Sequence, residues 1–347
     1  MAPSFFGGAP LFSQLFPPQR ELPFMSYHPR AEIPNLASFV TTRTRRQRLW
    51  FANNEAVEQH TLALLAKCSE RYRATLYAFC LQGTHPHLTG RFPLCNRANF
   101  MRDLNSGTAC AVARLTPNYP GGPLWHRRYS LEHIWDDSDI EAQFFYTVLQ
   151  PVKDGLVPKL SEYPFYNCFY DAVRGIERKF KLVNWTRYNE AKRYNKDVSI
   201  KDFIETYTLT YDRLPGYDHL SQRDYRILME KKLEIHRVRI IKERVAAGKL
   251  HFIGREKLLS MKPGEELIPS EPKEVTRNTF RPRVIARGEG RYQLALEWYF
   301  DFYHSYKYAS KRYRAGDINC KFPPGSYRPM APPIFHIPQG PYSVIGA

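Results

Sequence analysis

Two histidines, a tyrosine and a glutamine are spaced so that together they could cleave a phosphodiester bond. His85 and His87 are two residues apart, and side chains two apart in an extended strand point to the same face. Tyr146 and Gln150 are four apart, which places them on one face of a helix. If the two faces meet, two ring nitrogens and an amide oxygen could hold a divalent ion beside a phenol. This combination indicates metal-assisted attack by a tyrosine on a phosphate.

Each of these residues also has a more ordinary interpretation. An isolated H-x-H pair is commonly an incidental or surface pair. Tyr146 follows Phe144 and Phe145 and could be a core aromatic, and Gln150 could be a solvated residue before Pro151. The functional hypothesis therefore depends on the joint spacing of the four residues and not on any one of them.

The composition favours an anionic partner. The 347 residues include 51 Lys and Arg against 34 Asp and Glu, a formal net charge of +17. Such an excess favours a polyanion, although a solvated basic surface would give the same count. Aromatic residues make up 14% of the chain, and basic groups interleaved with aromatics suit single-stranded nucleic acid, where phosphates pair and bases stack. The length predicts two domains.

The cysteines and the apolar runs predict a cytoplasmic protein. No C-x-x-C pair occurs, so we expect buried thiols and neither a disulfide framework nor a zinc site. No apolar run approaches the roughly 20 residues of a membrane span. Residues 1–35 are rich in Pro and Gly and predict an irregular N-terminal arm, not a signal peptide. The six cysteines are Cys68, Cys80, Cys95, Cys110, Cys168 and Cys320.

Hydrophobic periodicity and capping residues predict a catalytic domain over residues 36–160. Its elements are expected in the order strand, helix, strand, strand, helix, strand, helix. Asn54 and residues 136–139 are expected to cap the first and third helices, residues 83–84 to form a turn, and Pro151 to end the last helix. This order predicts an α+β fold: a ferredoxin-like or RRM-like antiparallel sheet with helices on one face. The predicted ranges are 38–45, 54–72, 74–80, 85–90, 99–115, a short strand within 124–135, and 140–150.

The remainder of the chain predicts a connector over residues 161–220 and a mainly helical, basic C-terminal extension over 221–347. A long helix is expected over 221–247 and a Tyr-rich helix over 291–314, with a loop over 262–290. Within 222–249 there are nine Lys or Arg against four Asp or Glu. This helix presents either a DNA-binding face or an ordinary solvated surface, and the sequence favours neither.

Four motifs taken together resemble the HUH single-tyrosine transposases, and among them the REP-associated tyrosine transposases in a version with a C-terminal extension. The motifs are TTRTR at 41–45, HPH at 85–87, WHRRY at 125–129 and YTVLQPVKDGLV at 146–157. The resemblance covers about residues 36–170. Residues 254–256, 282–284 and 313–327 resemble the extended members more loosely.

The resemblance implies a nuclease-ligase that acts on single-stranded or hairpin DNA, often as a homodimer. His85, His87 and Gln150 would bind Mg²⁺ or Mn²⁺. Tyr146 would form a 5′-phosphotyrosine link and free a 3′-OH, which can then rejoin the strand. A covalent link conserves the energy of the broken bond, which explains the use of a tyrosine in place of water.

The basic residues near these motifs are candidate DNA contacts. Those of the first strand could instead form an exposed basic edge that discourages aggregation, and one of the later pair could form an ion pair with Asp136 or Asp137. The candidates are Arg43, Arg45, Arg46, Arg48, Arg127 and Arg128.

Two residues depart from the family pattern. Pro86 stands between the histidines, where a bulky apolar residue is usual, and proline is uncommon in a central strand because it lacks an N–H. It predicts a bend that would separate the two rings. Thr84 stands where the family commonly has Asn, which predicts the loss of a contact that supports the first histidine.

Two other functions are compatible with the sequence. The chain could be a domesticated protein that binds single-stranded or hairpin DNA without cutting it. It could also be a metal-dependent protein that binds or cleaves RNA on the same scaffold.

Overall fold

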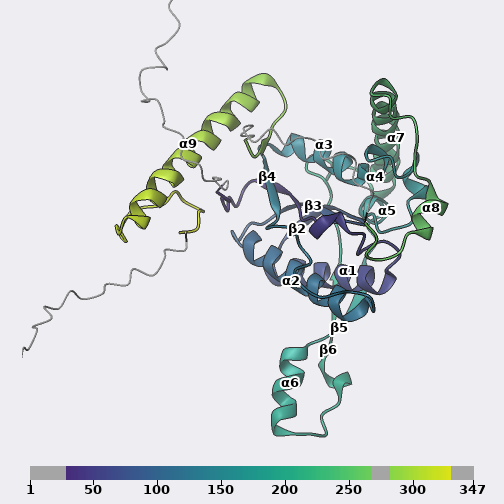
Figure 1. The fold of residues 1–347 in the computed structure, drawn as a ribbon. Helices are drawn as coiled ribbons and strands as arrows, with labels where there is room; N and C mark the ends of the chain where they lie inside the picture. Colours follow the sequence, from purple (N-terminus) through teal and green to yellow (C-terminus); the bar gives the residue numbers. More distant parts are fainter. Residues whose placement is uncertain (1–28, 267–281, 330–347) are drawn as a thin grey trace, which may run out of the picture.

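A computed structural model describes residues 29–266 and 282–329 (Figure 1). Most of the predicted N-terminal arm, half of the predicted loop over 262–290 and the end of the tail lie outside the described residues. The centre of the molecule is a five-stranded sheet in the order β2-β3-β1-β4-β7. Its first four strands are antiparallel to their neighbours, and β7 runs parallel to β4. The strands are β1 (Ala37–Thr41), β2 (Thr75–Gln82), β3 (His85–Arg91), β4 (Ser130–Ile134) and β7 (Val284–Ile285).

Helices cover both faces of this sheet. Helices α1 (Glu55–Tyr72) and α2 (Arg97–Leu115) lie on one face, and α3 (Asp137–Val148) and α4 (Gln150–Lys153) lie on the other (Figure 1). Thr89 of β3 and Thr147 of α3 share a buried hydrogen bond of 2.9 Å between their hydroxyls. The α+β class is therefore confirmed, and α3, which carries Tyr146, adds a layer on the sheet face opposite α1 and α2.

Local capping chemistry determines where these helices begin. Asn54 accepts a hydrogen bond from the Val57 amide at the start of α1, and Asp136 accepts one from the Ser138 amide at the start of α3. Both satisfy backbone N–H groups that have no partner within the helix. Both caps were predicted. Pro151, however, does not end the helical run; it lies in the first turn of α4, where its missing N–H is not needed.

Strand β1 is shorter than predicted. It ends at Thr41, and residues 45–47 form a 3-10 turn in which Arg46 and Gln47 have positive φ angles of 56° and 52°. A strand over 38–45 would have placed Arg43 and Arg45 on one face. The backbone of the basic segment instead bonds two loops: the Thr44 amide donates to the Thr84 carbonyl at 2.9 Å and the Arg45 amide to the Leu124 carbonyl at 2.7 Å.

Pro86 is accommodated within β3 without disrupting the sheet. It is opposite Leu81 of β2, whose amide donates away from β3 to the Tyr166 carbonyl at 3.0 Å. The backbone of Pro86 therefore faces the β1 side, where its carbonyl accepts a hydrogen bond from Thr41 Oγ1 at 2.9 Å. Because β1 ends at Thr41, no strand residue requires an N–H at this position. The predicted distortion is absent from the described pairing of β3.

The predicted connector contains ordered structure. After α5 (Phe169–Arg174), strands β5 (Arg178–Val183) and β6 (Ile204–Leu209) pair along their whole length, with α6 (Trp185–Tyr194) between them. This unit projects from the body beyond α1 (Figure 1). Most of its strand residues are partly or fully exposed, so they lack the apolar alternation by which a strand is recognised in a sequence.

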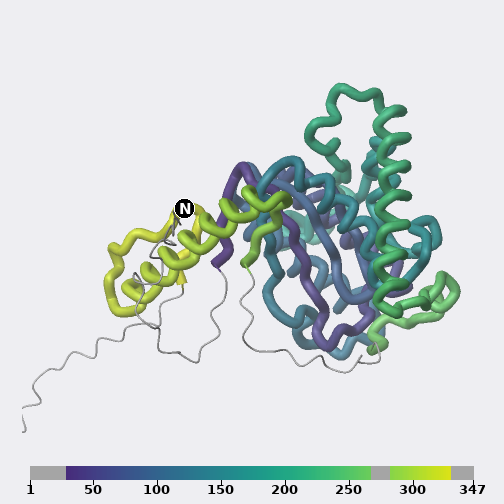
Figure 2. The backbone as a smooth tube through the Cα atoms, turned by 90° about the horizontal axis from the view of Figure 1, so that it is seen from above, coloured from purple at the N-terminus to yellow at the C-terminus, as the bar shows by residue number. Residues whose placement is uncertain are grey.

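The C-terminal extension is largely helical, as predicted. Helix α7 (Gln222–Ala246) packs near α3 and α4, and α8 (Arg255–Ser260) follows it. Helix α9 (Glu289–Arg314) begins beside β7 and extends away from the sheet (Figure 2). Short 3-10 helices occupy Arg45–Gln47, Leu160–Glu162 and Ile200–Phe203.

Two further sequence predictions can be compared with the described residues. Within them, no helix is both long and apolar enough to cross a membrane. All six cysteines are free, but only four are buried; Cys95 and Cys110 are exposed, which corrects the prediction that all are buried thiols. Cys95 precedes helix α2 and Cys110 lies within it, both at solvent-facing positions where a small thiol is tolerated.

Candidate functional site

The two histidines of β3 lie side by side on the sheet face beneath α3. Their ring centroids are 4.5 Å apart, so the intervening proline has not separated them. Thr84 Oγ1 lies 2.6 Å from His85 Nδ1, so Thr84 makes the supporting contact that its identity had put in doubt. In the tautomer that donates Nδ1–H to this hydroxyl, His85 Nε2 keeps a free lone pair.

Burial keeps both rings neutral. His85 and His87 are 7% and 4% exposed. Burial, and to a smaller extent the charge of Arg43, lowers the pKa of His85 to about 3. Burial, and then the charges of His85, Arg43 and Lys153, place the pKa of His87 well below its usual value. Neutral imidazoles have lone pairs for a cation, and the neighbouring arginine and lysine make the same site favourable for an anion.

Tyr146 lies next to this pair through a shared neighbour. Phe39 of β1 stacks on His87 with centroids 5.6 Å apart, and contacts the Tyr146 ring edge-on at 5.5 Å. All three side chains belong to one chain, so the nucleophile candidate and the histidines meet within a single molecule. Tyr146 is 38% exposed, in contrast to its buried neighbours Phe144 and Phe145. This exposure excludes the interpretation of Tyr146 as a core aromatic.

Gln150 is buried at the junction of α3 and α4. Leu149 interrupts the helix with φ −93° and ψ 8°, and Gln150 begins the next turn. Gln150 is only 3% exposed, which excludes a solvated residue. Its Nε2 is buried and has no hydrogen-bond partner among the described residues. Because amide O and N positions are assigned and can be exchanged, the side chain could present either atom.

The residues present fit a divalent cation. Both ring nitrogens of His87 are buried and without a hydrogen-bond partner among the described residues, as is the amide nitrogen of Gln150. Such atoms are costly unless something binds them. Two imidazoles and an amide oxygen suit Mn²⁺ or Zn²⁺ and are compatible with Mg²⁺. In the described part of the chain no cluster of three or more His, Cys, Asp or Glu could serve instead.

The two basic segments predicted to contact DNA lie side by side. Thr44 pairs with Trp125, and the His126 amide donates to the Arg43 carbonyl at 2.9 Å. Arginines from both segments are exposed at this junction: Arg43, Arg45, Arg46, Arg127 and Arg128.

Arg48, another of the predicted DNA contacts, forms an ion pair within the chain. Its Nε and Nη2 both donate to Glu266 Oε1, at 3.0 and 2.8 Å. Its guanidinium therefore links the turn after β1 to the segment after α8.

Two basic residues of this region were missed. Lys153 Nζ lies 4.0 Å from the centroid of the Tyr146 ring. It is seven residues away along a helix with a break, a spacing that no motif distinguishes. Arg30 covers the Tyr129 ring at 4.2 Å and donates to the Tyr129 carbonyl at 2.6 Å. Burial, with the nearby charges of Arg127 and Arg128 among the smaller causes, lowers the pKa of Arg30 to about 10.

Comparison with proteins of known structure gives two likenesses. One, a REP-associated tyrosine transposase bound to a REP hairpin, shares 20% identity at a TM-score of 0.38, over 43% of this chain and 86% of the other. The second is described as "a putative transposase" from Deinococcus radiodurans R1, with 16% identity, a TM-score of 0.26, and coverage of 37% and 95%.

Both descriptions name transposases. No family model matches the chain, and no curated protein matches it. The likenesses are partial, so the chemistry of the site is argued from its own residues.

Proposed function

We propose that the protein is a single-stranded DNA nuclease-ligase, a transposase that cleaves and rejoins a strand through Tyr146. The observation that carries the proposal is the joint geometry of the site. Two neutral, buried histidine rings lie 4.5 Å apart, and a partly exposed phenol lies beside them across Phe39. A packed core would have buried the phenol and given the ring nitrogens partners.

The side chains around the phenol have separate tasks. Phe39 holds the Tyr146 ring edge-on and excludes water from one side of it. Lys153 covers the ring and places a positive charge where a phosphate would approach. Arg43 acts electrostatically on both histidines and adds a second positive charge. These charges reduce the repulsion between a phosphodiester and its attacking oxygen.

His85, His87 and Gln150 would hold the divalent ion. Bound there, Mg²⁺ or Mn²⁺ would supply Lewis-acid polarisation of the phosphate. The proline between the histidines and the hydroxyl of Thr84 keep the two rings in place for this task.

The proposed reaction exchanges one phosphoester for another. The bond from the phenolic oxygen of Tyr146 to phosphorus forms, and the bond from phosphorus to the 3′-oxygen breaks. The phenol gives up its proton, and the departing oxygen takes one to become a 3′-OH. The products are a 5′-phosphotyrosine and a free 3′ end, and the reverse reaction rejoins them without an added energy source.

The test is formation of a covalent adduct. The full chain is incubated with 5′- and 3′-labelled hairpin oligonucleotides bearing single-stranded flanks and Mn²⁺ or Mg²⁺, then resolved under denaturing conditions. We expect a protein–DNA adduct carrying the label 3′ to the cut. Tyr146→Phe should abolish it. Tyr194→Phe is the matched control, because Tyr194 is 89% exposed on α6 and outside the site.

The remaining outcomes separate the alternatives. An adduct that persists in Tyr146→Phe would refute the assigned nucleophile. Binding of the hairpin without an adduct in any metal would instead support a DNA-binding protein that does not cut. Preference for an RNA hairpin of the same sequence would support the RNA alternative. Elution of the covalent complex from a size-exclusion column at the mass of two chains would support the homodimer that the resemblance implies.

A further inference from the structure

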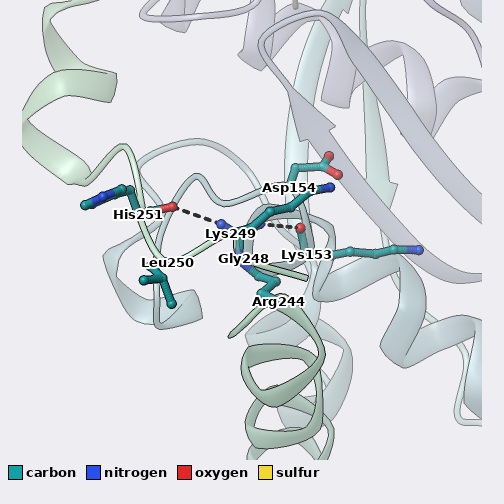
Figure 3. Close-up of a pocket in the computed structure, with 7 residues that line it drawn as sticks. All are labelled: Lys153, Asp154, Arg244, Gly248, Lys249, Leu250 and His251. Carbon is teal, nitrogen blue, oxygen red and sulfur yellow. Dashed lines mark hydrogen bonds between the residues drawn. The ribbon is translucent and has the colours of Figure 1, made fainter. Parts of the chain in front are cut away.

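A basic pocket opens where the end of α4 meets the end of α7 (Figure 3). It has a volume of about 480 Å³, within the range of small-ligand sites. Three cationic side chains line it against one carboxylate. The lining residues are Lys153, Asp154, Arg244, Gly248, Lys249, Leu250 and His251.

Arg244 fixes the walls of this pocket. Its Nη1 donates to the Lys153 carbonyl and its Nη2 to the His251 carbonyl, both at 2.9 Å (Figure 3). The guanidinium also lies 4.7 Å from the centroid of the Phe252 ring. One side chain of α7 thereby joins the end of α4 to the segment that follows α7.

Backbone hydrogen bonds hold the same two segments together. The Ile253 amide donates to the Gly155 carbonyl and the Gly254 amide to the Leu156 carbonyl, both at 2.9 Å. Gly155 has φ 77°, and a Cβ there would collide with the Arg244 guanidinium. The pocket is therefore a built feature of the α4–α7 junction and not a gap between mobile side chains.

The charges of the pocket are not consumed by its own carboxylate. Asp154 Oδ2 accepts a hydrogen bond of 3.0 Å from Gln82 Nε2 on β2, which holds the carboxylate toward the sheet. No ion pair to Asp154 is found among the described residues. Leu250 is 61% exposed at the rim and offers an apolar surface beside the cations.

Lys153 connects this pocket to the proposed nucleophile. Lys153 is one of the lining residues; its carbonyl accepts a hydrogen bond from Arg244, and its side chain points away from Arg244 and His251 (Figure 3), with Nζ 4.0 Å from the centroid of the Tyr146 ring. A strand whose scissile phosphate lies at Tyr146 would therefore carry a neighbouring phosphate past Lys153 toward Lys249. Successive phosphates of a single strand are spaced by one nucleotide, and a groove that follows the backbone must supply a cation for each.

We propose that this pocket seats a backbone phosphate of single-stranded DNA adjacent to the phosphate that Tyr146 attacks. The proposal rests on the function proposed above and assigns a DNA contact to the C-terminal extension. Lys249 and Lys153 supply the charge, Arg244 positions the walls, and Leu250 contacts the adjoining sugar or base. The helix α7 thus contributes its end, and not its whole basic face, to the substrate.

The test compares two lysines of the extension by their effect on the salt dependence of binding. Full-length Tyr146→Phe protein, which cannot form the adduct, is titrated with a fluorescent single-stranded oligonucleotide at 50 to 200 mM salt. Lys249→Gln removes a pocket cation. Lys242→Gln removes the same charge from a different surface of α7, which it shares with Ile235 and Val238.

Loss of one phosphate contact lowers the slope of log K against log salt by about 0.7 for single strands. Over a fourfold rise in salt, the parent should therefore lose roughly 2.6-fold more affinity than Lys249→Gln. Lys242→Gln should keep the parental slope. Equal slopes for the two variants would overturn the proposal, because the pocket lysine would then act only through net charge.

Two further measurements separate this site from other sources of phosphate and from the cleavage activity. Inorganic phosphate and a 5′-mononucleotide are titrated against the protein. If either binds saturably and Lys249→Gln abolishes that binding, while the oligonucleotide shows no slope difference, the ligand of the pocket would be a free phosphate and not DNA. A slope difference in the Tyr146→Phe background, together with no adduct from the protein that keeps Tyr146, would retain the pocket while refuting the nuclease. An adduct with unchanged slopes would retain the nuclease and refute the pocket.

Discussion

Gly155 is the position at which a single methyl group should reveal how α7 is coupled to the proposed site. In Gly155→Ala the residue must keep φ 77°, which costs a non-glycine residue roughly 1–2 kcal/mol, partly offset by the stiffer unfolded chain. The new Cβ also displaces the Arg244 guanidinium from two carbonyls. Charged hydrogen bonds contribute about 1.5–3 kcal/mol each, and partial exposure reduces this, so we expect about 2 kcal/mol for the pair.

The structure contains a matched control for the backbone contribution. Gly248 has φ 70°, and a Cβ there would meet nothing within 4 Å. Gly248→Ala should therefore lower the free energy of unfolding by about 1 kcal/mol, and Gly155→Ala by about 3 kcal/mol. Both values are measured by urea denaturation, with the m-value checked for each variant.

A double-mutant cycle with Arg244→Ala isolates the collision. Without the guanidinium, Gly155→Ala should cost only the backbone amount, so the coupling energy between positions 155 and 244 should be about 2 kcal/mol. The reasoning is refuted if Gly155→Ala and Gly248→Ala destabilise equally, or if the excess survives in the Arg244→Ala background. Either result would mean that the observed packing of Arg244 does not hold α7 against α4.

Three further outcomes follow from buried contacts. Thr89→Val should destabilise the protein by about 1–3 kcal/mol in urea because it leaves the Thr147 hydroxyl unpaired, whereas the double change to valine should be nearly neutral. Phe39→Ala should lower the free energy of unfolding by about 3–5 kcal/mol and slow adduct formation by Tyr146. Phe39→Leu should retain most of the stability and most of the rate of adduct formation. Burial lowers the pKa of His133 to about 3, so between about pH 6.5 and 3 this residue binds a proton only in the unfolded chain, and the free energy of unfolding falls as pH falls. His133→Leu should reduce the slope of the free energy of unfolding against pH by about 1.4 kcal/mol per pH unit in this range. An unchanged slope would contradict the burial of His133.

The parts of the fold that local chemistry dictates were predictable. The caps at Asn54 and Asp136 and the turn before His85 gave the limits of three elements to within a few residues. The hydrophobic periodicity of α1 and α7 likewise indicated their extents. These signals act between residues close in sequence, so a single sequence contains them.

The errors arose where distant segments decide the outcome. Pro86 was expected to distort β3, and it does not, because β1 ends at Thr41 and leaves the proline nitrogen without a strand to pair with. The sequence could not show that Arg48, a predicted DNA contact, bonds Glu266, 218 residues away. Lys153 was overlooked because its relation to Tyr146 depends on the break between α3 and α4.

The candidate site was predictable in its residue types but not in its environment. Spacing alone paired His85 with His87, and the structure brings their rings together. Spacing could not show that Phe39 lies between His87 and the phenol, or that Tyr146 is exposed while its neighbours are buried. Those facts depend on two strands, β1 and β3, and the helix α3, which meet only in the folded chain.

Strands β2 and β4 are both bonded by other segments of the chain on the side away from the centre of the sheet. Along β2, Phe79 and Leu81 bond the segment 166–168, and along β4 the amides of His133 and Trp135 donate to the β7 segment. Exposed borders are where two sheets most readily join into one. A second copy of this protein could therefore not extend the sheet along these stretches of β2 and β4 without displacing the segments that already bond them.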